Sequence, residues 1–166
     1  MRNVILAGFM GTGKTAVGRA LAKRLKMKFV DMDDIIEARE GMKVFEIFER
    51  RGEPYFRRAE KMVAKDIAVQ SGLVVAAGGG AMIDEENVKN FKSNGVIFCL
   101  TATPDKIFER TKGHLHRPLL NVSDPKEKIA ELLAKRAQYY ARADHRIDTT
   151  DLSIDEVADK IAEHLK

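Results

Sequence analysis

The sequence contains a single cysteine, Cys99, among its 166 residues. One thiol cannot form an internal disulfide bond, and its place in an apolar run predicts a buried structural cysteine and not a reactive one. No apolar run approaches the length needed to span a bilayer. The first residues lead straight into an apolar segment without a signal peptide. We therefore expect a cytoplasmic protein that has no membrane partner.

The charge balance has no strong excess of either sign. The chain has 29 Lys and Arg residues against 25 Asp and Glu residues, a net charge of +4, and no basic run stands out. This distribution is compatible with anionic ligands and is weak evidence for nucleic acid. The chain also lacks an internal repeat, a linker and a low-complexity segment. Its length then predicts one domain spanning residues 1–166.

The segment Gly8–Thr15 fits the phosphate-binding pattern Gly-x4-Gly-Lys-[Ser/Thr] without a mismatch. An apolar run at Asn3–Ala7 predicts a strand before it, and apolar residues at a spacing of 3–4 predict a helix after it. Glycines let the backbone approach a ligand closely, and the N-terminus of the helix favours phosphate. We expect Lys14 to reach the β- and γ-phosphates of a nucleoside triphosphate and the Thr15 hydroxyl to bind Mg²⁺.

Apolar runs and helical patterns alternate along the rest of the chain. Further strands are predicted at residues 28–31, 73–77, 96–100 and 146–148, with helical patterns between them. This alternation predicts an α/β fold, with a parallel sheet covered by helices on both faces. The pattern breaks at residues 112–122, a basic segment with Gly and Pro that we interpret as a mobile lid.

Asp31, Asp33 and Asp34 follow the second predicted strand, at the sheet edge where ligands bind in α/β proteins. Asp33 is suited either to a ligand or to the N-cap of the next helix, and Asp34 is an equal candidate for the cap. Both roles are compatible, with Asp34 as the cap and Asp33 facing the ligand. Gly78–Gly80 follow the third strand and are either a second site for backbone contacts or only a turn.

Two arginines lie on predicted helices. Arg57 precedes Glu60 by three residues, so the two share a helix face and can pair. Arg136 precedes Tyr139 and Tyr140 by three and four residues. Taken alone, each arginine is more typical of a solvated surface.

With these elements placed, the chain resembles the shikimate kinases over nearly its whole length. Besides the phosphate loop, the resemblance rests on Asp31-Met32-Asp33, Phe45–Phe48 with Gly52-Glu53, Phe56-Arg57, Gly78–Gly80, Arg117-Pro118-Leu119, and Arg136 with its tyrosines. It implies a three-layer α/β/α P-loop kinase fold like that of nucleoside monophosphate kinases. The sheet would have five parallel strands in the order 2-3-1-4-5 beside a lid. It also implies transfer of the γ-phosphoryl group of ATP to the 3-hydroxyl of shikimate, on the path to chorismate and the aromatic amino acids.

The same resemblance assigns roles to individual residues. For ATP it implies Gly11, Thr12, Gly13, Lys14, Thr15 and Ala16, with Arg110 against adenine and Arg117 closing onto the phosphates. For Mg²⁺ it implies Thr15 and, through water, Asp31. For shikimate it implies Asp33, Arg57, Gly78, Gly79, Gly80 and Arg136. Lys14, Asp33 and Arg117 would carry the catalysis.

Two other functions remain open from the sequence. One is another small-molecule kinase on the same fold, such as a gluconate or nucleoside monophosphate kinase. The other is a non-catalytic regulator that binds a nucleotide, although intact Lys14, Thr15, Asp33 and Arg117 argue against it. A GTPase is disfavoured because the chain has no Asn-Lys-x-Asp element. Ile154 stands where the family often has a proline against adenine, which leaves the nucleotide preference open. The resemblance also implies a monomer.

Overall fold

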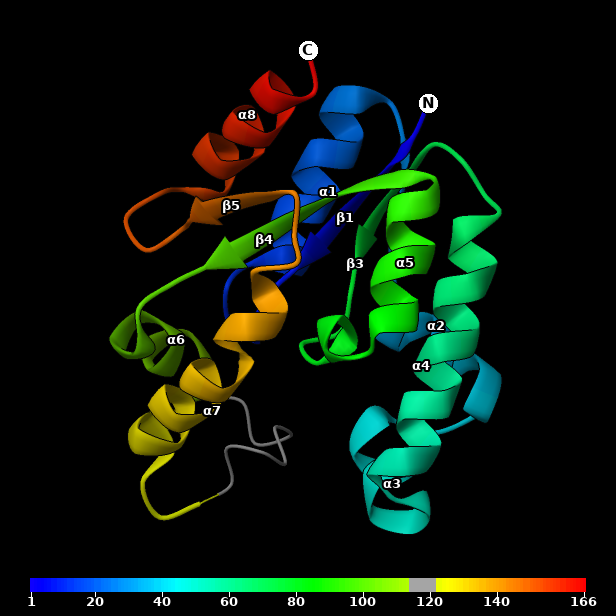
Figure 1. Cartoon of the computed structure of the whole chain (residues 1–166). Helices are drawn as coiled ribbons and strands as arrows, with labels where there is room; N and C mark the ends of the chain where they lie inside the picture. Colours follow the sequence, from blue (N-terminus) through cyan, green and yellow to red (C-terminus); the bar gives the residue numbers. More distant parts are fainter. Residues whose placement is uncertain (114–121) are drawn as a thin grey trace.

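The computed structural model describes residues 1–113 and 122–166. Among them, five parallel strands form one sheet in the order β2-β3-β1-β4-β5, as predicted (Figure 1). The three central strands β3, β1 and β4 are mostly apolar, which suits a sheet buried on both faces, whereas the edge strands β2 and β5 carry charged residues. The strands are β1 (Asn3–Ala7), β2 (Lys28–Asp31), β3 (Leu73–Ala76), β4 (Gly95–Thr101) and β5 (His145–Asp148).

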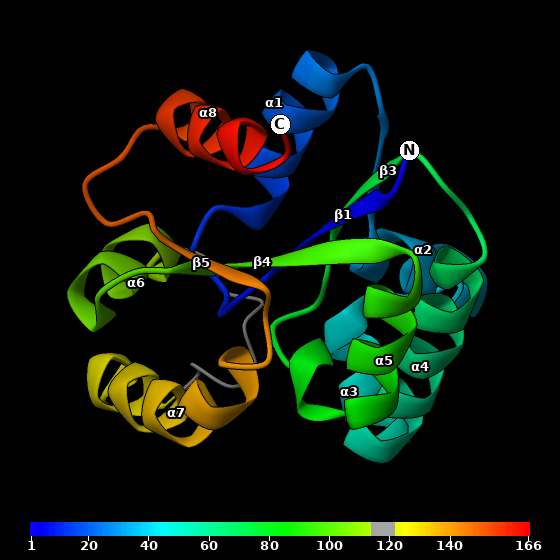
Figure 2. The ribbon, with the colours of Figure 1, turned by 45° about the horizontal axis from the view of Figure 1, so that its top comes forward.

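Helices cover the sheet on both sides. In Figures 1 and 2, α1 and α8 lie over one face, and α2, α4, α5 and α7 lie over the other. This arrangement gives the three layers that the alternating pattern predicted. The helices are α1 (Lys14–Leu25), α2 (Met32–Glu40), α3 (Val44–Arg51), α4 (Glu53–Ala68), the 3₁₀ turn η1 (Ala81–Ile83), α5 (Glu85–Ser93), α6 (Pro104–Thr111), α7 (Pro125–Tyr140) and α8 (Ile154–His164).

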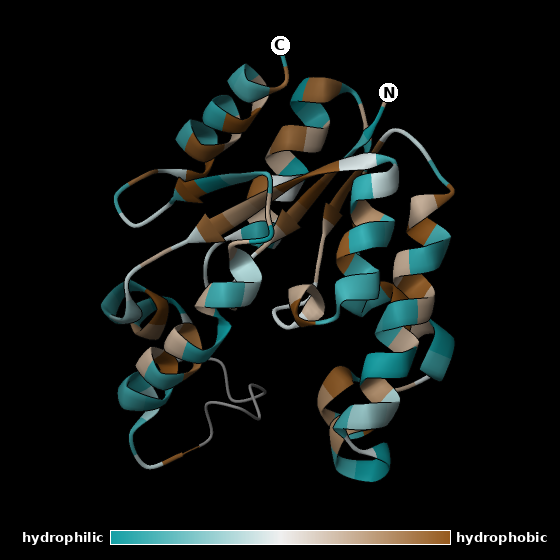
Figure 3. Ribbon diagram, in the orientation of Figure 1, coloured by the Kyte–Doolittle hydropathy of each residue, from teal (hydrophilic) through white to brown (hydrophobic). Residues whose placement is uncertain are grey.

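The core has one layer on each face of the sheet, and β1 contributes to both. Val4 and Leu6 pack with residues of α1 and α8, whereas Ile5 and Ala7 pack with residues of α4 and α5. Successive side chains of a strand point to opposite faces, so this division follows from the period of two. Figure 3 shows the resulting apolar strands between helices that are hydrophilic on their outer sides.

Cys99 lies in β4 and is fully buried, as its apolar context predicted. Burial raises the pKa of its thiol to about 11, so the reactive thiolate is scarce at neutral pH. Within the described ranges, no helix has both the length and the apolar character that crossing a bilayer requires.

The carboxyl ends of the strands open between two groups of helices. The group α2, α3 and α4 stands on one side, and α6 with α7 stands on the other (Figure 1). A cavity of about 570 Å³ lies between them. After β1 the chain builds β2 and β3 on one side of that strand and then crosses to build β4 and β5 on the other side. Open α/β sheets bind their ligands at such a switch point.

Candidate active site

The phosphate loop joins β1 to α1 at this edge of the sheet. Gly8, Gly11 and Gly13 all have positive φ, at 130°, 78° and 96°, a region that glycine adopts without strain. A side chain on Gly8 would also collide with the backbone of Leu100. Gly13 is the N-cap of α1, so the positive end of that helix faces the loop. The loop therefore has the backbone conformation that its glycines predicted, and phosphate binding by it stays a prediction.

Lys14 and Arg110 both donate to the loop. Lys14 Nζ donates to the Gly8 and Phe9 carbonyls at 2.6 and 3.1 Å. Arg110, from α6, donates to the Gly11 carbonyl at 3.1 Å and to the Thr149 carbonyl at 3.0 Å. Arg110 therefore links the phosphate loop to the segment after β5, and its predicted contact with adenine stays a prediction.

Thr15 and Asp31 lie together, as predicted for a metal site. The Thr15 hydroxyl donates to Asp31 Oδ2 at 3.0 Å. Hydroxyl and carboxylate oxygens suit Mg²⁺, which takes few protein ligands when phosphates supply others. The oxygens of Thr15 and Asp31 therefore fit Mg²⁺ brought in by a nucleotide.

The N-cap of α2 is Asp31, so the expectation that Asp34 or Asp33 caps this helix is wrong. Asp31 Oδ1 accepts a hydrogen bond from the Asp33 backbone N–H at 2.9 Å. The helix begins at Met32 because β2 runs into it without a loop, which places Asp33 and Asp34 in its first turn. Asp31 thus serves the cap with one oxygen and Thr15 with the other, and Asp33 lines the cavity.

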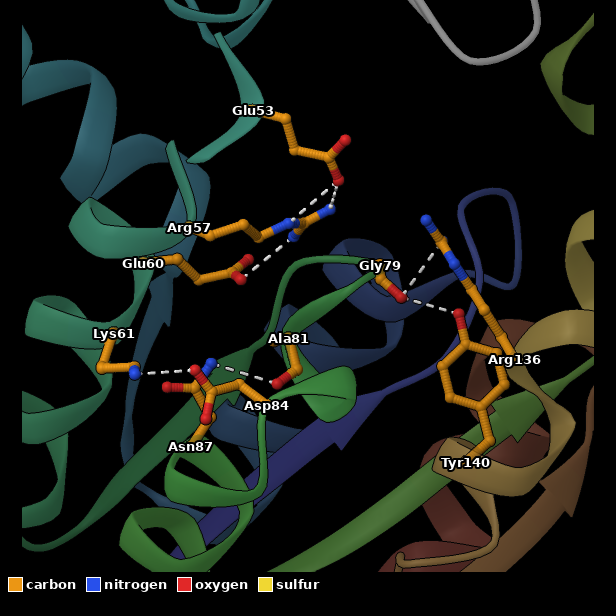
Figure 4. A network of polar contacts seen from close by, with 10 residues as sticks. All are labelled: Glu53, Arg57, Glu60, Lys61, Gly79, Ala81, Asp84, Asn87, Arg136 and Tyr140. Carbon is orange, nitrogen blue, oxygen red and sulfur yellow. Dashed lines mark hydrogen bonds and ion pairs between the residues drawn. The ribbon is translucent and has the colours of Figure 1, made fainter. Parts of the chain in front are cut away.

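Helix α4 forms one wall of the cavity through Arg57. Its guanidinium donates to Glu60 at 3.0 Å, the predicted pair, and to Glu53 at 3.2 Å (Figure 4). Burial opposes the charge on Arg57, but Glu60 and Glu53 raise the pKa of the guanidinium above its ordinary value. Burial also raises the pKa of Glu60, which is only 1% exposed, although Arg57 opposes this rise. Arg57 is therefore a fixed cation at the cavity.

The glycine segment after β3 forms the floor of the cavity. A Cβ on Gly80 would lie 2.6 Å from Arg57 Nη2, although the φ of Gly80 is an ordinary −106°. A Cβ on Gly78 would lie 2.7 Å from Glu60 Oε2 and 3.4 Å from Asp33 Oδ1. These two glycines are needed for close approach by polar side chains, so the segment is more than a strand-ending turn.

Helix α7 forms the opposite wall through Arg136, which is 7% exposed. Its guanidinium lies 5.5 Å from the centre of the Phe9 ring and donates to the Gly79 carbonyl at 3.4 Å. Tyr140 donates to the same carbonyl at 2.6 Å. Figure 4 shows Arg136 and Tyr140 on one side of Gly79 and Arg57 on the other. Arginines from two walls thus flank one glycine segment.

The cavity brings together most of the predicted site. Thr12 is an exception, because its buried hydroxyl donates to the Phe9 carbonyl at 2.7 Å and only its backbone remains available. Arg117 and most of the predicted lid lie outside the described residues. The predicted residues that line the cavity are Gly11, Gly13, Lys14, Thr15, Ala16, Asp31, Asp33, Arg57, Gly78, Gly79, Gly80, Arg110 and Arg136.

Sequence reasoning missed several residues of the site. Glu53 pairs with Arg57, and its position four residues before that arginine on one helix face was an available signal. The sequence left open whether Tyr139 or Tyr140 is the tyrosine that matches the family, and it missed the contact of Tyr140 with Gly79, which joins residues 61 apart. Val44 and Phe48 line the cavity from α3, where their apolar spacing indicates only packing.

A parallel sheet in this order, with a phosphate loop between β1 and α1 and a cavity over the strand ends, defines a P-loop kinase. A family model described as Shikimate kinase matches residues 10–166. The chain belongs to the shikimate kinase family.

Individual relatives agree with this family. The chain is 50% identical to the shikimate kinase of Thermodesulfovibrio yellowstonii over 161 residues, which cover 97% of this chain and 93% of that protein. It is 45% identical to the shikimate kinase of Pelotomaculum thermopropionicum, over 100% of this chain and 96% of that one. The solved shikimate kinase from Acinetobacter baumannii, in complex with shikimate, matches with a TM-score of 0.95 and 36% identity over 99% of this chain and 93% of that one.

Proposed function

We propose that this cavity transfers the γ-phosphoryl group of ATP to the 3-hydroxyl of shikimate, giving shikimate 3-phosphate and ADP. One observation carries the assignment of the site: Arg57 and Arg136 line the same cavity as the phosphate loop, from opposite walls. Shikimate is a carboxylated polyol, and guanidinium groups match a planar carboxylate. The cavity thus has a cationic site for the acceptor beside an anion cradle for the donor.

The phosphate loop binds and orients the nucleotide. Backbone N–H groups of Gly11–Ala16 hold the phosphates, and Lys14 exchanges its carbonyl partners for phosphate oxygens when ATP binds. Thr15 and Asp31 are the residues that would hold Mg²⁺, which neutralises charge on the phosphates. Arg110 lies close enough to the loop to meet the nucleotide, and Arg117 adds positive charge from the lid.

Asp33 orients the hydroxyl that attacks. A carboxylate only accepts hydrogen bonds, so it suits the hydroxyls of a polyol and receives the proton that leaves as the new bond forms. Phosphoryl transfer depends mainly on positioning and on neutralising negative charge. Asp33, Arg57, Arg136 and Gly78–Gly80 therefore act by holding shikimate in line with the γ-phosphate.

We further propose that residues 1–166 form one kinase domain with a lid at about 112–122, and that the protein is a cytoplasmic monomer without nucleic-acid or membrane partners. A monomer of this chain has a mass of 18.6 kDa, which light scattering after gel filtration would test directly.

The reaction is tested by ATP-dependent ADP release with Mg²⁺, with and without shikimate. Gluconate and nucleoside monophosphates serve as control acceptors, because kinases of the same fold use such substrates. We expect strong stimulation by shikimate alone. Nucleotide binding without stimulation by any acceptor would instead support a non-catalytic regulator, and stimulation by gluconate would assign a different kinase.

A further inference from the structure

The Gly79 carbonyl is held by two donors from α7. The Tyr140 hydroxyl donates at 2.6 Å, and Arg136 Nη1 donates at 3.4 Å (Figure 4). Tyr140 is the last residue of α7, is 5% exposed, and is not among the described residues that line the cavity. It therefore acts on the cavity only through the residues that it contacts.

The bonds that hold the Gly79 carbonyl also fix the direction of the Gly80 N–H. The Gly79 carbonyl and the Gly80 N–H belong to one peptide unit, and the described chain has no cis peptide bond. In a planar trans peptide the C=O and the N–H point in opposite directions. The carbonyl points toward α7, so the N–H points toward α4, where Arg57 lies against Gly80.

The 3₁₀ turn η1, which follows the glycine segment, is held in the same way. Asn87 of α5 donates to the Ala81 carbonyl at 3.1 Å. Arg142 donates to the Met82 and Ile83 carbonyls at 3.1 and 3.0 Å. These contacts fix the turn that leads into α5, and Tyr140 fixes the glycine segment that faces the cavity.

We propose that Tyr140 is a positioning residue for the substrate carboxylate, because its bond to Gly79 keeps the Gly80 N–H and the Arg136 guanidinium directed into the cavity. This inference rests on the proposed function. The short bond from Tyr140 satisfies the carbonyl, so Arg136 contributes only a long one and its guanidinium remains available to a ligand. Burial raises the pKa of Tyr140 to about 12, and the hydroxyl therefore remains a donor throughout the pH range of kinase assays.

Removing the hydroxyl leaves Arg136 as the remaining donor to that carbonyl among the described residues. A buried acceptor without its partner is costly, so the guanidinium moves toward Gly79 and away from the substrate. We expect Tyr140→Phe to raise the dissociation constant for shikimate by about five- to tenfold. The KM for ATP should stay within about twofold of the wild-type value, since the nucleotide site is not involved.

Tyr139→Phe is the matched control. Tyr139 precedes Tyr140 on the same helix, and its ring packs against the Arg142 guanidinium at 5.0 Å, a contact that phenylalanine keeps. This variant should bind shikimate within about twofold of the wild-type value, because it removes a hydroxyl without a bond to Gly79. Equal losses in both variants would overturn the proposal.

A second measurement separates positioning from a general loss of structure. For each protein we compare kcat/KM for shikimate with kcat/KM for shikimate methyl ester, at saturating ATP. Loss of the carboxylate contacts lowers this ratio by about fivefold in Tyr140→Phe. A merely structural role would lower both values together and leave the ratio unchanged, which overturns the proposal.

Both kcat/KM values of the ratio are measured on the same protein. If Tyr140→Phe is less stable, the ratio can therefore be measured at 10 °C for every protein. The failure of the proposed function looks different, because the wild-type protein would then not phosphorylate shikimate. If the wild-type protein phosphorylates shikimate and Tyr140→Phe has the same ratio as the wild type, the role of Tyr140 is overturned and the proposed function stands.

Discussion

At the residue scale, Lys14 is the residue whose role in the proposed reaction is most sharply defined. Its amine already lies across the phosphate loop, where it donates to two carbonyls of that loop. We expect Lys14→Ala to lower kcat by about a hundredfold or more, because it removes a cation from the phosphates whose charge changes in the transition state. Steady-state kinetics with shikimate and ATP measure this loss. Turnover close to that of the wild-type protein would contradict the assignment of the loop.

Gly80 allows a different test, because space and not backbone conformation requires glycine there. A Cβ on Gly80 would meet the Arg57 guanidinium at 2.6 Å, whereas a Cβ on Gly79 would meet Arg136 Nη1 at 3.7 Å, an ordinary contact. Gly80→Ala therefore displaces the flexible end of Arg57 without disturbing the fold. We expect the KM for shikimate to rise about tenfold or more, since a charge-assisted contact is lost.

Gly79→Ala serves as the comparison for Gly80→Ala. It should raise the KM for shikimate by less, because its new methyl group has room. The KM for ATP should change little in both variants. A larger effect in Gly79→Ala than in Gly80→Ala would show that Arg57 is not what the glycine at position 80 accommodates.

At the scale of elements, Asn3 joins three segments that are distant in the sequence. It begins β1, is 2% exposed, and donates from Nδ2 to the Ile67 and Gln70 carbonyls at 3.2 and 2.9 Å. Its Oδ1 accepts from the Leu73 N–H at 3.0 Å. One side chain thus connects β1 to the end of α4 and to the start of β3.

We expect Asn3→Ala to lower the free energy of unfolding by about 2–4 kcal/mol, because it removes three hydrogen bonds at a buried position and leaves the buried Leu73 N–H without its acceptor. Asn94→Ala is the control, since Asn94 also donates to the Gln70 carbonyl, at 2.8 Å, but through a solvent-exposed hydrogen bond from a half-buried position. Asn94→Ala should lower the free energy of unfolding by less than about 1 kcal/mol. Urea denaturation measures the free energy of unfolding of both variants. Similar losses would show that burial of Asn3 does not determine its contribution to stability.

The same scale shows what the sequence can predict and what it cannot. The strand order came from the family resemblance, and local patterns indicated the phosphate loop and the pairing of Arg57 with Glu60, because these depend on neighbours within a few residues. The cap of α2 was predicted wrongly because three nearby aspartates satisfy the same local rule, and only the direct passage of β2 into the helix selects Asp31. The contacts of Asn3 and Tyr140 join residues more than 60 apart, and spacing along the chain carries no signal for them.

At the scale of the whole molecule, the cavity separates two groups of helices that carry opposite halves of one site. Arg57 belongs to α4 and Arg136 to α7, and the glycine segment lies between them. A ligand that binds both arginines connects the two walls, and it stabilises the folded protein by mass action. At a shikimate concentration of about 100 times its dissociation constant, this stabilisation is about 2.7 kcal/mol.

This stabilisation is measured by calorimetry, because the chain has no tryptophan to serve as a fluorescence probe. We expect shikimate to raise the Tm of the wild-type protein by about 5–10 °C at that concentration. Arg57→Ala and Arg136→Ala should each bind shikimate about ten- to a hundredfold more weakly and so lose about half of this shift or more. Arg58→Ala is the control, because Arg58 is exposed on the same helix as Arg57 and does not line the cavity.

A double variant tests whether Arg57 and Arg136 hold one carboxylate together. If they do, the double variant should lose less binding free energy than the sum of the two single losses, by about 1 kcal/mol or more. Strict additivity would mean that the two arginines contact separate groups of the ligand, and the carboxylate would then have to be assigned to only one wall.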